Sequence, residues 1–350
     1  MFYESTIFKK EEVLYPEYLP EVLPHREMQI KWIARNLEPA ARGRIPINTF
    51  IYGPPGIGKT ASIKFVFREF EKFSGLKTIY INCWEFNTSI AVMSEITLNL
   101  GIFVQRRGWS KDEVFTRMIE ALRKWGKGII VCLDEVDQLI YKDVNALYDL
   151  VRINQYVKIP FGLVFISNYK HVFAKVEPRI KSSLRIDEIE FKPYSFLEMK
   201  DILEERAKDA FFGYEKGAIA LAANEAIKKG GDVRIGLEIL LKAGRLAERH
   251  NARKLLTKFV REVIKKVEPV KPKIIEESLG EKERILLDVI RKKFKKGEFT
   301  AKEVCKEFNK ALEESIGERM VRNYLKHLSE VGMIETIKKG KNVFFRLKVK

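Results

Sequence analysis

Continuous hydrophobic runs alternate with longer amphipathic stretches through the first half of the chain. Four runs are apolar at most positions, and they cover residues 50–52, 78–82, 128–133 and 161–166. A strand that is apolar on both faces is typical of a parallel sheet covered by helices on both sides. Between the runs, stretches such as 61–73 have a helical pattern. The chain therefore predicts an α/β domain over residues 1–190, which begins with an irregular arm at 1–23.

The hydrophobic pattern changes after residue 190. Helical segments at 196–211, 216–228 and 233–250 follow one another with no strand-like run between them. This indicates a separate helical domain over residues 191–268, which we call the lid. Two prolines and several charged residues then favour a linker at 269–278.

The last part of the chain, residues 279–350, has the pattern of a small DNA-binding domain. An amphipathic helix is predicted at 281–296, and Thr300 with Glu303 forms a capping-box pattern that begins a second helix. A third helix at 317–328 and a hairpin of 334–337 with 343–347 complete a winged helix. In such domains the third helix enters the major groove and the hairpin contacts phosphate or the minor groove. We therefore expect DNA contacts from Arg319, Arg322, Asn323, Lys326, Lys338, Lys339 and Lys341.

A glycine-rich loop, GPPGIGKT at residues 53–60, lies between the first hydrophobic run and the following helical stretch. Strand, loop and helix in this order are the context in which such a loop wraps a polyphosphate with its backbone N–H groups. Lys59 is then expected to reach the β- and γ-phosphates, and the Thr60 hydroxyl to hold Mg²⁺. The predicted nucleotide contacts in this segment are Gly56, Ile57, Gly58, Lys59, Thr60 and Ala61.

Polar residues follow two further hydrophobic runs, at the strand ends where ligands of parallel sheets gather. Asp134 and Glu135 end one run and Asn168 ends the next. We expect Asp134 to hold Mg²⁺ and Glu135 to polarise the attacking water, the alternative being that both acids cap the next helix. Asn168 is placed to orient that water or to sense the γ-phosphate. Arg234, in the first turn of a predicted helix, opposes the helix dipole, which favours an anionic partner.

Composition and charge restrict the class of protein further. The 350 residues carry a formal net charge of +17 with a pI of about 9.5, which favours a polyanionic partner. The excess is concentrated after residue 278, where Lys and Arg number 19 against 11 Asp and Glu. No apolar run approaches the roughly 20 residues of a membrane span, and residues 1–23 lack a signal-peptide pattern. Three scattered cysteines indicate free thiols. We expect a cytoplasmic protein with no membrane partner.

With these motifs together, the chain resembles the AAA+ ATPases. Among them it resembles the archaeal replication initiators, which are related to the largest origin recognition complex subunit and to its helicase-loading relative. The resemblance covers nearly the whole chain, and its carriers include the phosphate loop and the C-terminal winged helix. The other motifs are LPHRE at 23–27, LDEVD at 133–137, ISN at 166–168, EPRIKSSL at 177–184 and GDVR at 231–234.

The resemblance implies roles for residues around the nucleotide. Asn168 would be the first sensor and Arg234 the second. Tyr194 and Arg206 match positions that line the nucleotide, their alternatives being hinge packing and a solvated helix charge. The entry motif adds His25 and Arg26 as nucleotide-binding candidates.

The resemblance also implies contacts with partners. Arg179 would reach the ATP of a neighbouring subunit. The motif here ends in Ser-Ser where many relatives have Ser-Arg, which leaves Arg185 as the second candidate for this role. These initiators carry an extra helical element after the second strand. It falls at about residues 86–108 of this chain, where Arg106 and Arg107 are the candidates for DNA contact.

By this resemblance, the chain is expected to be an ATP-dependent replication initiator. It would bind duplex origin DNA through the winged helix and the AAA+ domain, act with other initiator protomers and help load the replicative helicase. ATP or ADP with Mg²⁺ would set its conformation, and hydrolysis would be slow. Two alternatives stay open: a Holliday-junction branch-migration motor of the RuvB type, and a nucleotide-gated DNA-binding regulator of mobile-element origin.

Overall fold

The chain forms two compact units, Met1–Ile264 and Lys265–Lys350, each with a hydrophobic core of its own. A computed structural model describes residues 7–103, 108–266, 281–294, 297–310, 316–330, 333–339 and 342–347. The predicted linker at 269–278 lies outside these residues. None of the described helices is both long and apolar enough to cross a membrane.

The first unit contains the expected parallel sheet. Its strands are ordered β2-β3-β4-β1-β5 and all pairs are parallel. The fifth strand was not predicted, because only its Ile189 is buried and its sequence, IDEIE, offers no hydrophobic run. The bounds are β1 Asn48–Tyr52, β2 Lys77–Asn82, β3 Ile129–Asp134, β4 Phe161–Ser167 and β5 Ile186–Glu190.

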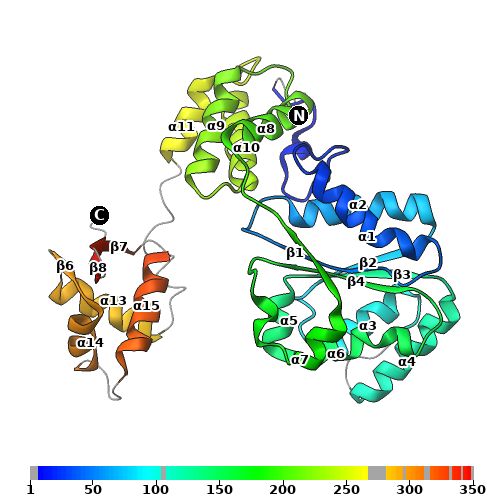
Figure 1. The fold of residues 1–350 in the computed structure, drawn as a ribbon. Coiled ribbons are helices and arrows are strands. Elements are labelled where there is room, and N and C mark those ends of the chain that lie inside the picture. The colour runs from blue at the N-terminus through cyan, green and yellow to red at the C-terminus, as the bar shows by residue number, and fades with distance from the viewer. Residues whose placement is uncertain are drawn as a thin grey trace. The chain divides into compact units, whose positions relative to one another are not determined.

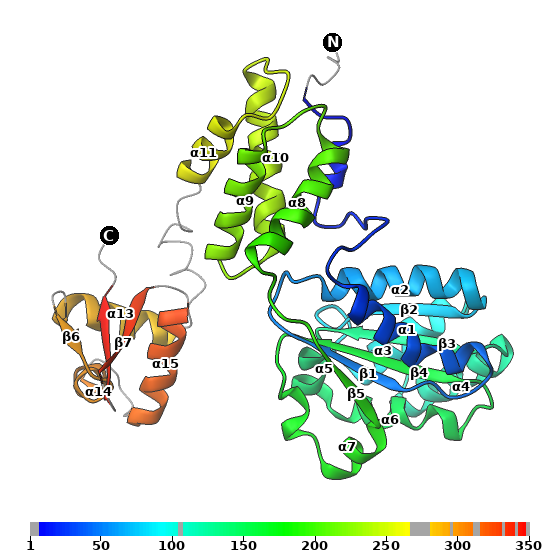
Figure 2. The same ribbon diagram turned by 45° about the horizontal axis from the view of Figure 1, so that its top comes forward.

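Helices cover both faces of this sheet, as the apolar strands require. Helices α1 (Glu27–Ala41) and α2 (Lys59–Ser74) lie on one face (Figures 1 and 2). The opposite face packs against a second group of helices, and the buried side chains between them form the main core. This group contains α3 Ser89–Asn99, α4 Lys111–Trp125, α5 Val136–Asp143, α6 Asn145–Val151 and α7 Pro178–Leu184.

The lid follows the sheet and is helical throughout its described elements, as predicted. It contains α8 Phe196–Ala210, α9 Lys216–Lys228, α10 Val233–Arg249 and α11 Thr257–Lys266. The N-terminal arm packs on it: the rings of Phe8 and Phe211 stack at 5.1 Å, and the Lys9 amide donates to the Ala210 carbonyl over 2.8 Å. The arm therefore joins the lid to the first helix of the sheet domain.

The second unit is a winged helix with a three-stranded antiparallel sheet of order β6-β8-β7. Thr300 caps its second helix in the expected capping box with Glu303. Strand β6 was not predicted because it has only two residues, of which Phe299 is buried in the core. The elements are α13 Glu281–Lys293, β6 Glu298–Phe299, α14 Ala301–Asn309, α15 Glu318–Glu330, β7 Ile334–Lys339 and β8 Asn342–Leu347.

Candidate functional site

A large pocket opens in the first unit, at the carboxyl ends of the central strands. Its volume is about 980 Å³, and residues of the sheet domain, the lid and the arm all line it. Most of the polar residues predicted for the nucleotide site meet there. From the predicted set, the lining includes Gly56, Gly58, Lys59, Thr60, Ala61, Asp134, Glu135, Asn168, Tyr194, Arg206 and Arg234.

Two glycines give the phosphate loop its shape. Gly53 has φ +149°, and a Cβ atom there would lie 2.1 Å from the carbonyl oxygen of Phe191. Gly56 has φ +71°, and a Cβ atom there would lie 1.9 Å from Oδ1 of Asp232. Any side chain at these positions would collide with the segment that follows the sheet or with the lid. The loop is therefore a close-fitting cradle, which fits a polyphosphate held by backbone N–H groups.

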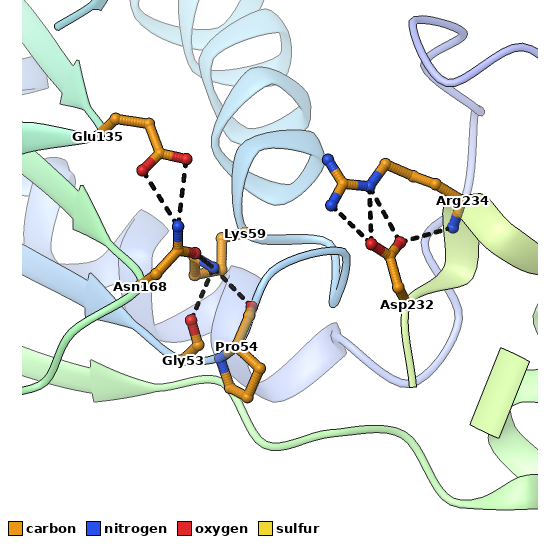
Figure 3. A network of polar contacts seen from close by, with 7 residues as sticks. All are labelled: Gly53, Pro54, Lys59, Glu135, Asn168, Asp232 and Arg234. Atoms are coloured by element: carbon orange, nitrogen blue, oxygen red, sulfur yellow. Dashed lines mark hydrogen bonds and ion pairs between the residues drawn. The ribbon is translucent and has the colours of Figure 1, made fainter. Parts of the chain in front are cut away.

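Lys59 is the centre of a buried hydrogen-bond network on the sheet side. Its Nζ atom donates to the carbonyls of Gly53 (2.8 Å) and Pro54 (2.7 Å) and to Oδ1 of Asn168 (2.8 Å), as Figure 3 shows. Asn168 in turn donates through Nδ2 to a carboxylate oxygen of Glu135 over 3.1 Å. Burial lowers the pKa of Lys59 and raises that of Glu135, which the neighbouring Asp134 carboxylate raises further. The structure thus joins the loop cation Lys59 to Glu135, the carboxylate predicted to polarise the attacking water, through Asn168.

Asp134 forms a second network with the loop. Its Oδ2 atom accepts hydrogen bonds from the hydroxyls of Thr60 (2.6 Å) and Tyr80 (2.7 Å), and its Oδ1 atom accepts one from the Glu135 amide (2.9 Å). Thr60 and Asp134 thus bring two hard oxygen ligands together beside the phosphate loop. This donor set fits Mg²⁺, which takes few protein ligands and completes its shell with phosphate oxygens and water.

Tyr80, on β2, is a site residue that the sequence did not reveal. Burial, and then the Asp134 carboxylate, raise the pKa of its hydroxyl, so Tyr80 is a hydrogen-bond donor at neutral pH. The Lys64 ammonium lies 4.6 Å from the centre of its ring. One feature of the sequence could have revealed Tyr80: it is a tyrosine near the carboxyl end of β2, the strand that pairs with the strand of Asp134.

His25 and Arg26 are not among the residues that line the pocket, and their contact with a nucleotide stays a prediction. Arg26 is buried and donates to the carbonyls of Ile57 (3.0 and 3.1 Å) and Lys192 (2.9 Å). Its guanidinium also lies 3.7 Å from the centre of the Tyr194 ring. His25 instead approaches Asp201 of the lid at 3.2 Å. Arg26 therefore holds the phosphate loop against the junction of the sheet domain and the lid. Ile57, which belongs to this loop, is itself buried.

Arg206 lines the pocket from the lid, but its guanidinium binds the arm. It donates to the carbonyls of Val13 (3.0 Å) and Tyr18 (3.2 Å) and lies 5.0 Å from the centre of the Tyr18 ring. Burial lowers its pKa. Arg206 thus holds the arm over the pocket, which is a stronger constraint than the solvated helix charge considered from the sequence. Tyr194 lines the same cavity, and burial raises the pKa of its hydroxyl to about 12.

Arg234 extends from the first turn of α10 and lies beside the pocket in an ion pair with Asp232. Its Nη2 atom is 2.6 Å from Oδ2 of Asp232, and this hydrogen bond raises the pKa of Arg234 (Figure 3). The side chain of Arg234 is 55% exposed. The lid therefore contributes a solvated cation that is already paired with Asp232, the residue at the start of the same helix.

The two arginines that are candidates for reaching the ATP of a neighbouring subunit lie away from this pocket. Arg179 is exposed on α7, and its carbonyl accepts hydrogen bonds from the hydroxyls of Ser182 and Ser183. Arg185, just after α7, is also exposed and has φ +44°. Neither lines the pocket of its own chain. Action on the site of a neighbouring subunit stays a prediction for both.

The candidate DNA contacts lie partly on described residues. Helix α15 exposes Arg319, Arg322, Asn323 and Lys326 at helical spacing on one face, and Arg322 pairs with Glu318 at 2.6 Å. Lys338 and Lys339 lie in β7, and only their backbone is described. The remaining candidates, Arg106, Arg107 and Lys341, lie outside the described residues.

This chain is similar to known protein families, relatives and solved structures. The AAA domain family matches residues 48–172, and the family of Cdc6 AAA+ ATPase-type lid domains matches residues 200–265. An ORC1-type DNA replication protein of Pyrococcus abyssi is 34% identical over 356 residues, covering 96% of this chain and 85% of that relative. An ORC1-type DNA replication protein 1 of Archaeoglobus fulgidus is 39% identical over 272 residues, covering 75% of this chain and 66% of that relative. The structure of the Aeropyrum pernix ORC1 protein in complex with DNA is similar at a TM-score of 0.78 and 31% identity, covering 99% of this chain and 95% of that one.

Proposed function

The chain belongs to the family of archaeal ORC1-type DNA replication proteins, and we propose that it is an ATP-dependent initiator that binds duplex origin DNA and helps load the replicative helicase. The observation that carries this proposal is the pocket itself. A glycine cradle, a buried lysine, an asparagine and two acids converge at one sheet edge, beneath a lid and an arm that also line the cavity.

The pocket fits ATP or ADP. The backbone of the phosphate loop would hold the phosphates, with Lys59 as their main cation. Thr60 and Asp134 would hold Mg²⁺, which supplies charge neutralisation when bound. Glu135, in its ionised form, would polarise the attacking water, and Asn168 would fix the position of that carboxylate.

The walls of the pocket favour a conformational switch. The lid and the arm are joined to each other by Arg206 and by the Phe8–Phe211 stack, and both line the cavity. Nucleotide binding would therefore order the phosphate loop, the lid and the arm together. A change of nucleotide at the site would in this way change the conformation of the lid and the arm. We propose that hydrolysis is slow and resets this arrangement.

The winged helix supplies the proposed DNA contact. Helix α15 carries exposed Arg319, Arg322, Asn323 and Lys326, and a helix of this kind docks in the major groove of DNA. The Aeropyrum pernix relative was determined in complex with DNA, which supports this assignment. The basic excess of the C-terminal residues adds a phosphate attraction that salt screens.

Footprinting of origin DNA tests the initiator function. A short protected element in the origin of the source organism is expected, with affinity that falls steeply as salt rises. Arg322→Ala should weaken this binding by about 1–3 kcal/mol if the side chain reads a base edge. Lys72→Ala, at an exposed position on α2, provides a control that should bind normally. Equal affinity for all duplexes at physiological salt would contradict sequence-specific initiation.

The same preparation separates the alternatives. A branch-migration motor of the RuvB type would form a ring with strong DNA-stimulated hydrolysis, whereas the proposed initiator shows little stimulation. Mapping of binding sites across the genome distinguishes an initiator from a regulator of mobile-element origin. Copurification with the replicative helicase and with other protomers tests the proposed partners.

A further inference from the structure

Asp232 lies where the lid comes closest to the phosphate loop. Its Oδ1 atom would be only 1.9 Å from a Cβ atom built on Gly56, and the Val233 amide donates to the Gly56 carbonyl over 3.0 Å. The charge of Asp232 is near enough to act on the Lys59 ammonium. The carboxylate therefore stands at the rim of the cradle that would hold the phosphates (Figure 3).

The same carboxylate holds Arg234. It accepts hydrogen bonds from the Arg234 amide (2.9 Å) and from Nε (2.9 and 3.1 Å), and Nη2 lies 2.6 Å from its second oxygen. A guanidinium binds a carboxylate and a phosphate with the same fork of donors, so the two anions compete for it. Arg234 also lines the pocket, which places both anions within the range of one side chain.

We propose that Asp232 is a positioning residue that competes with the γ-phosphate for Arg234 and so sets how strongly the site prefers ATP to ADP. With ADP, Arg234 stays on Asp232. With ATP, Arg234 exchanges the carboxylate for the phosphate, and Asp232 remains unpaired beside a polyanion, which weakens the preference for ATP. This inference rests on the proposed nucleotide binding.

A structural role of Asp232 is the alternative that a test has to separate. Asp232 is the N-cap of α10, because its side chain accepts a hydrogen bond from the Arg234 amide. Asparagine is as good an N-cap as aspartate but carries no charge, and serine also caps well. Asp232→Asn therefore removes the competing charge and keeps the cap, and Asp232→Ser does the same with a shorter side chain.

The decisive measurement is the ratio of the affinities for a non-hydrolysable ATP analogue and for ADP, by titration calorimetry with Mg²⁺. An exposed ion pair is weak, so Asp232→Asn should raise this ratio about threefold to tenfold. Asp209→Asn is the matched control, because Asp209 is an exposed carboxylate of the pocket wall whose charge acts on Arg206, whereas the acids that act on Arg234 are Asp232 and Glu135. This control should change both affinities by the same factor and leave the ratio unchanged.

A double-mutant cycle completes the test. On the background of Arg234→Ala, Asp232→Asn should change the ratio less than it does in the wild type, because the side chain for which the anions compete is absent and only the direct repulsion between Asp232 and the nucleotide remains. A wild-type ratio in both Asp232→Asn and Asp232→Ser, with normal thermal unfolding, would overturn the inference and leave Asp232 as a cap. Failure of the unmodified chain to bind either nucleotide would instead refute the proposed function.

Discussion

The two walls of the nucleotide pocket are built in different ways. On the sheet side, Lys59 and Asp134 are 6% and 4% exposed, and each is held by three hydrogen bonds from or to its side chain. On the lid side, Arg234 is 55% exposed and held by one acid on its own helix. The sheet wall is preorganised for charge, whereas the lid wall can exchange its partner at little cost.

We propose that this contrast allows one site both to bind nucleotide and to act as a switch. A buried network that is fully satisfied resists rearrangement, so we expect its geometry to change little when a ligand binds. A solvated ion pair has only a small stabilisation to lose. We therefore expect substitutions in the sheet wall to abolish function and substitutions in the lid wall to tune it.

The largest effect is expected for Lys59→Ala. The substitution removes the cation and leaves the carbonyls of Gly53 and Pro54 and the Asn168 side chain without their donor. ATP affinity should fall by about 1000-fold, as for the loss of one partner of a buried charged pair. Equilibrium binding of a fluorescent ATP analogue measures it, with Lys72→Ala on the same helix as the control. Retention of normal ATP binding would refute the assignment of the loop.

Glu135 is expected to give the next largest effect. Burial raises its pKa above the ordinary value of 4.5, and protonation removes the charge that polarises water. The value of kcat/KM for ATP should therefore fall as pH decreases, with a midpoint above 4.5. Glu135→Gln should reduce single-turnover hydrolysis about 100-fold or more while ATP binding persists. An acid limb at the ordinary pKa, or hydrolysis unaffected by the substitution, would contradict this role.

Thr60 should show an intermediate effect. Its hydroxyl and Asp134 are the two oxygens expected to hold Mg²⁺. Thr60→Ala should raise the Mg²⁺ concentration needed for tight ATP binding about tenfold, and Thr60→Ser should preserve the wild-type value because it keeps the hydroxyl. A magnesium titration at fixed ATP distinguishes them. Identical titrations for the two variants would show that the hydroxyl does not bind the metal.

The smallest effect is expected on the lid and arm side. Arg206→Ala removes two hydrogen bonds to arm carbonyls, and the free energy of unfolding should fall by about 1–3 kcal/mol. ATP affinity should fall only a few-fold, because the guanidinium acts through the arm. Chemical denaturation and calorimetry measure the two quantities, with Lys242→Ala as the control, because Lys242 is an exposed cation of α10 that does not line the pocket. A loss of affinity as large as that of Lys59→Ala would remove the distinction between the walls.

The sequence by itself determined the parts of this protein that are local patterns. The phosphate loop, the acids after β3, Asn168 after β4 and the Thr300 capping box each depend on neighbours in the chain, and parallel strands necessarily bring their carboxyl ends together. Strand β5 could not be predicted in this way, because it is an edge strand with a single buried residue and therefore carries no hydrophobic run.

Only the tertiary structure decided what the charged side chains around the pocket bind. Arg26 and Arg206 look like solvent-exposed or ligand-binding cations in the sequence, yet both bind carbonyls of distant segments. Tyr80 meets Asp134 across 54 residues, and Asp232 meets Gly56 across the junction of sheet domain and lid. A long charged side chain that becomes buried has to bind an acceptor within its reach. Which acceptor is available depends on packing between distant segments rather than on local spacing.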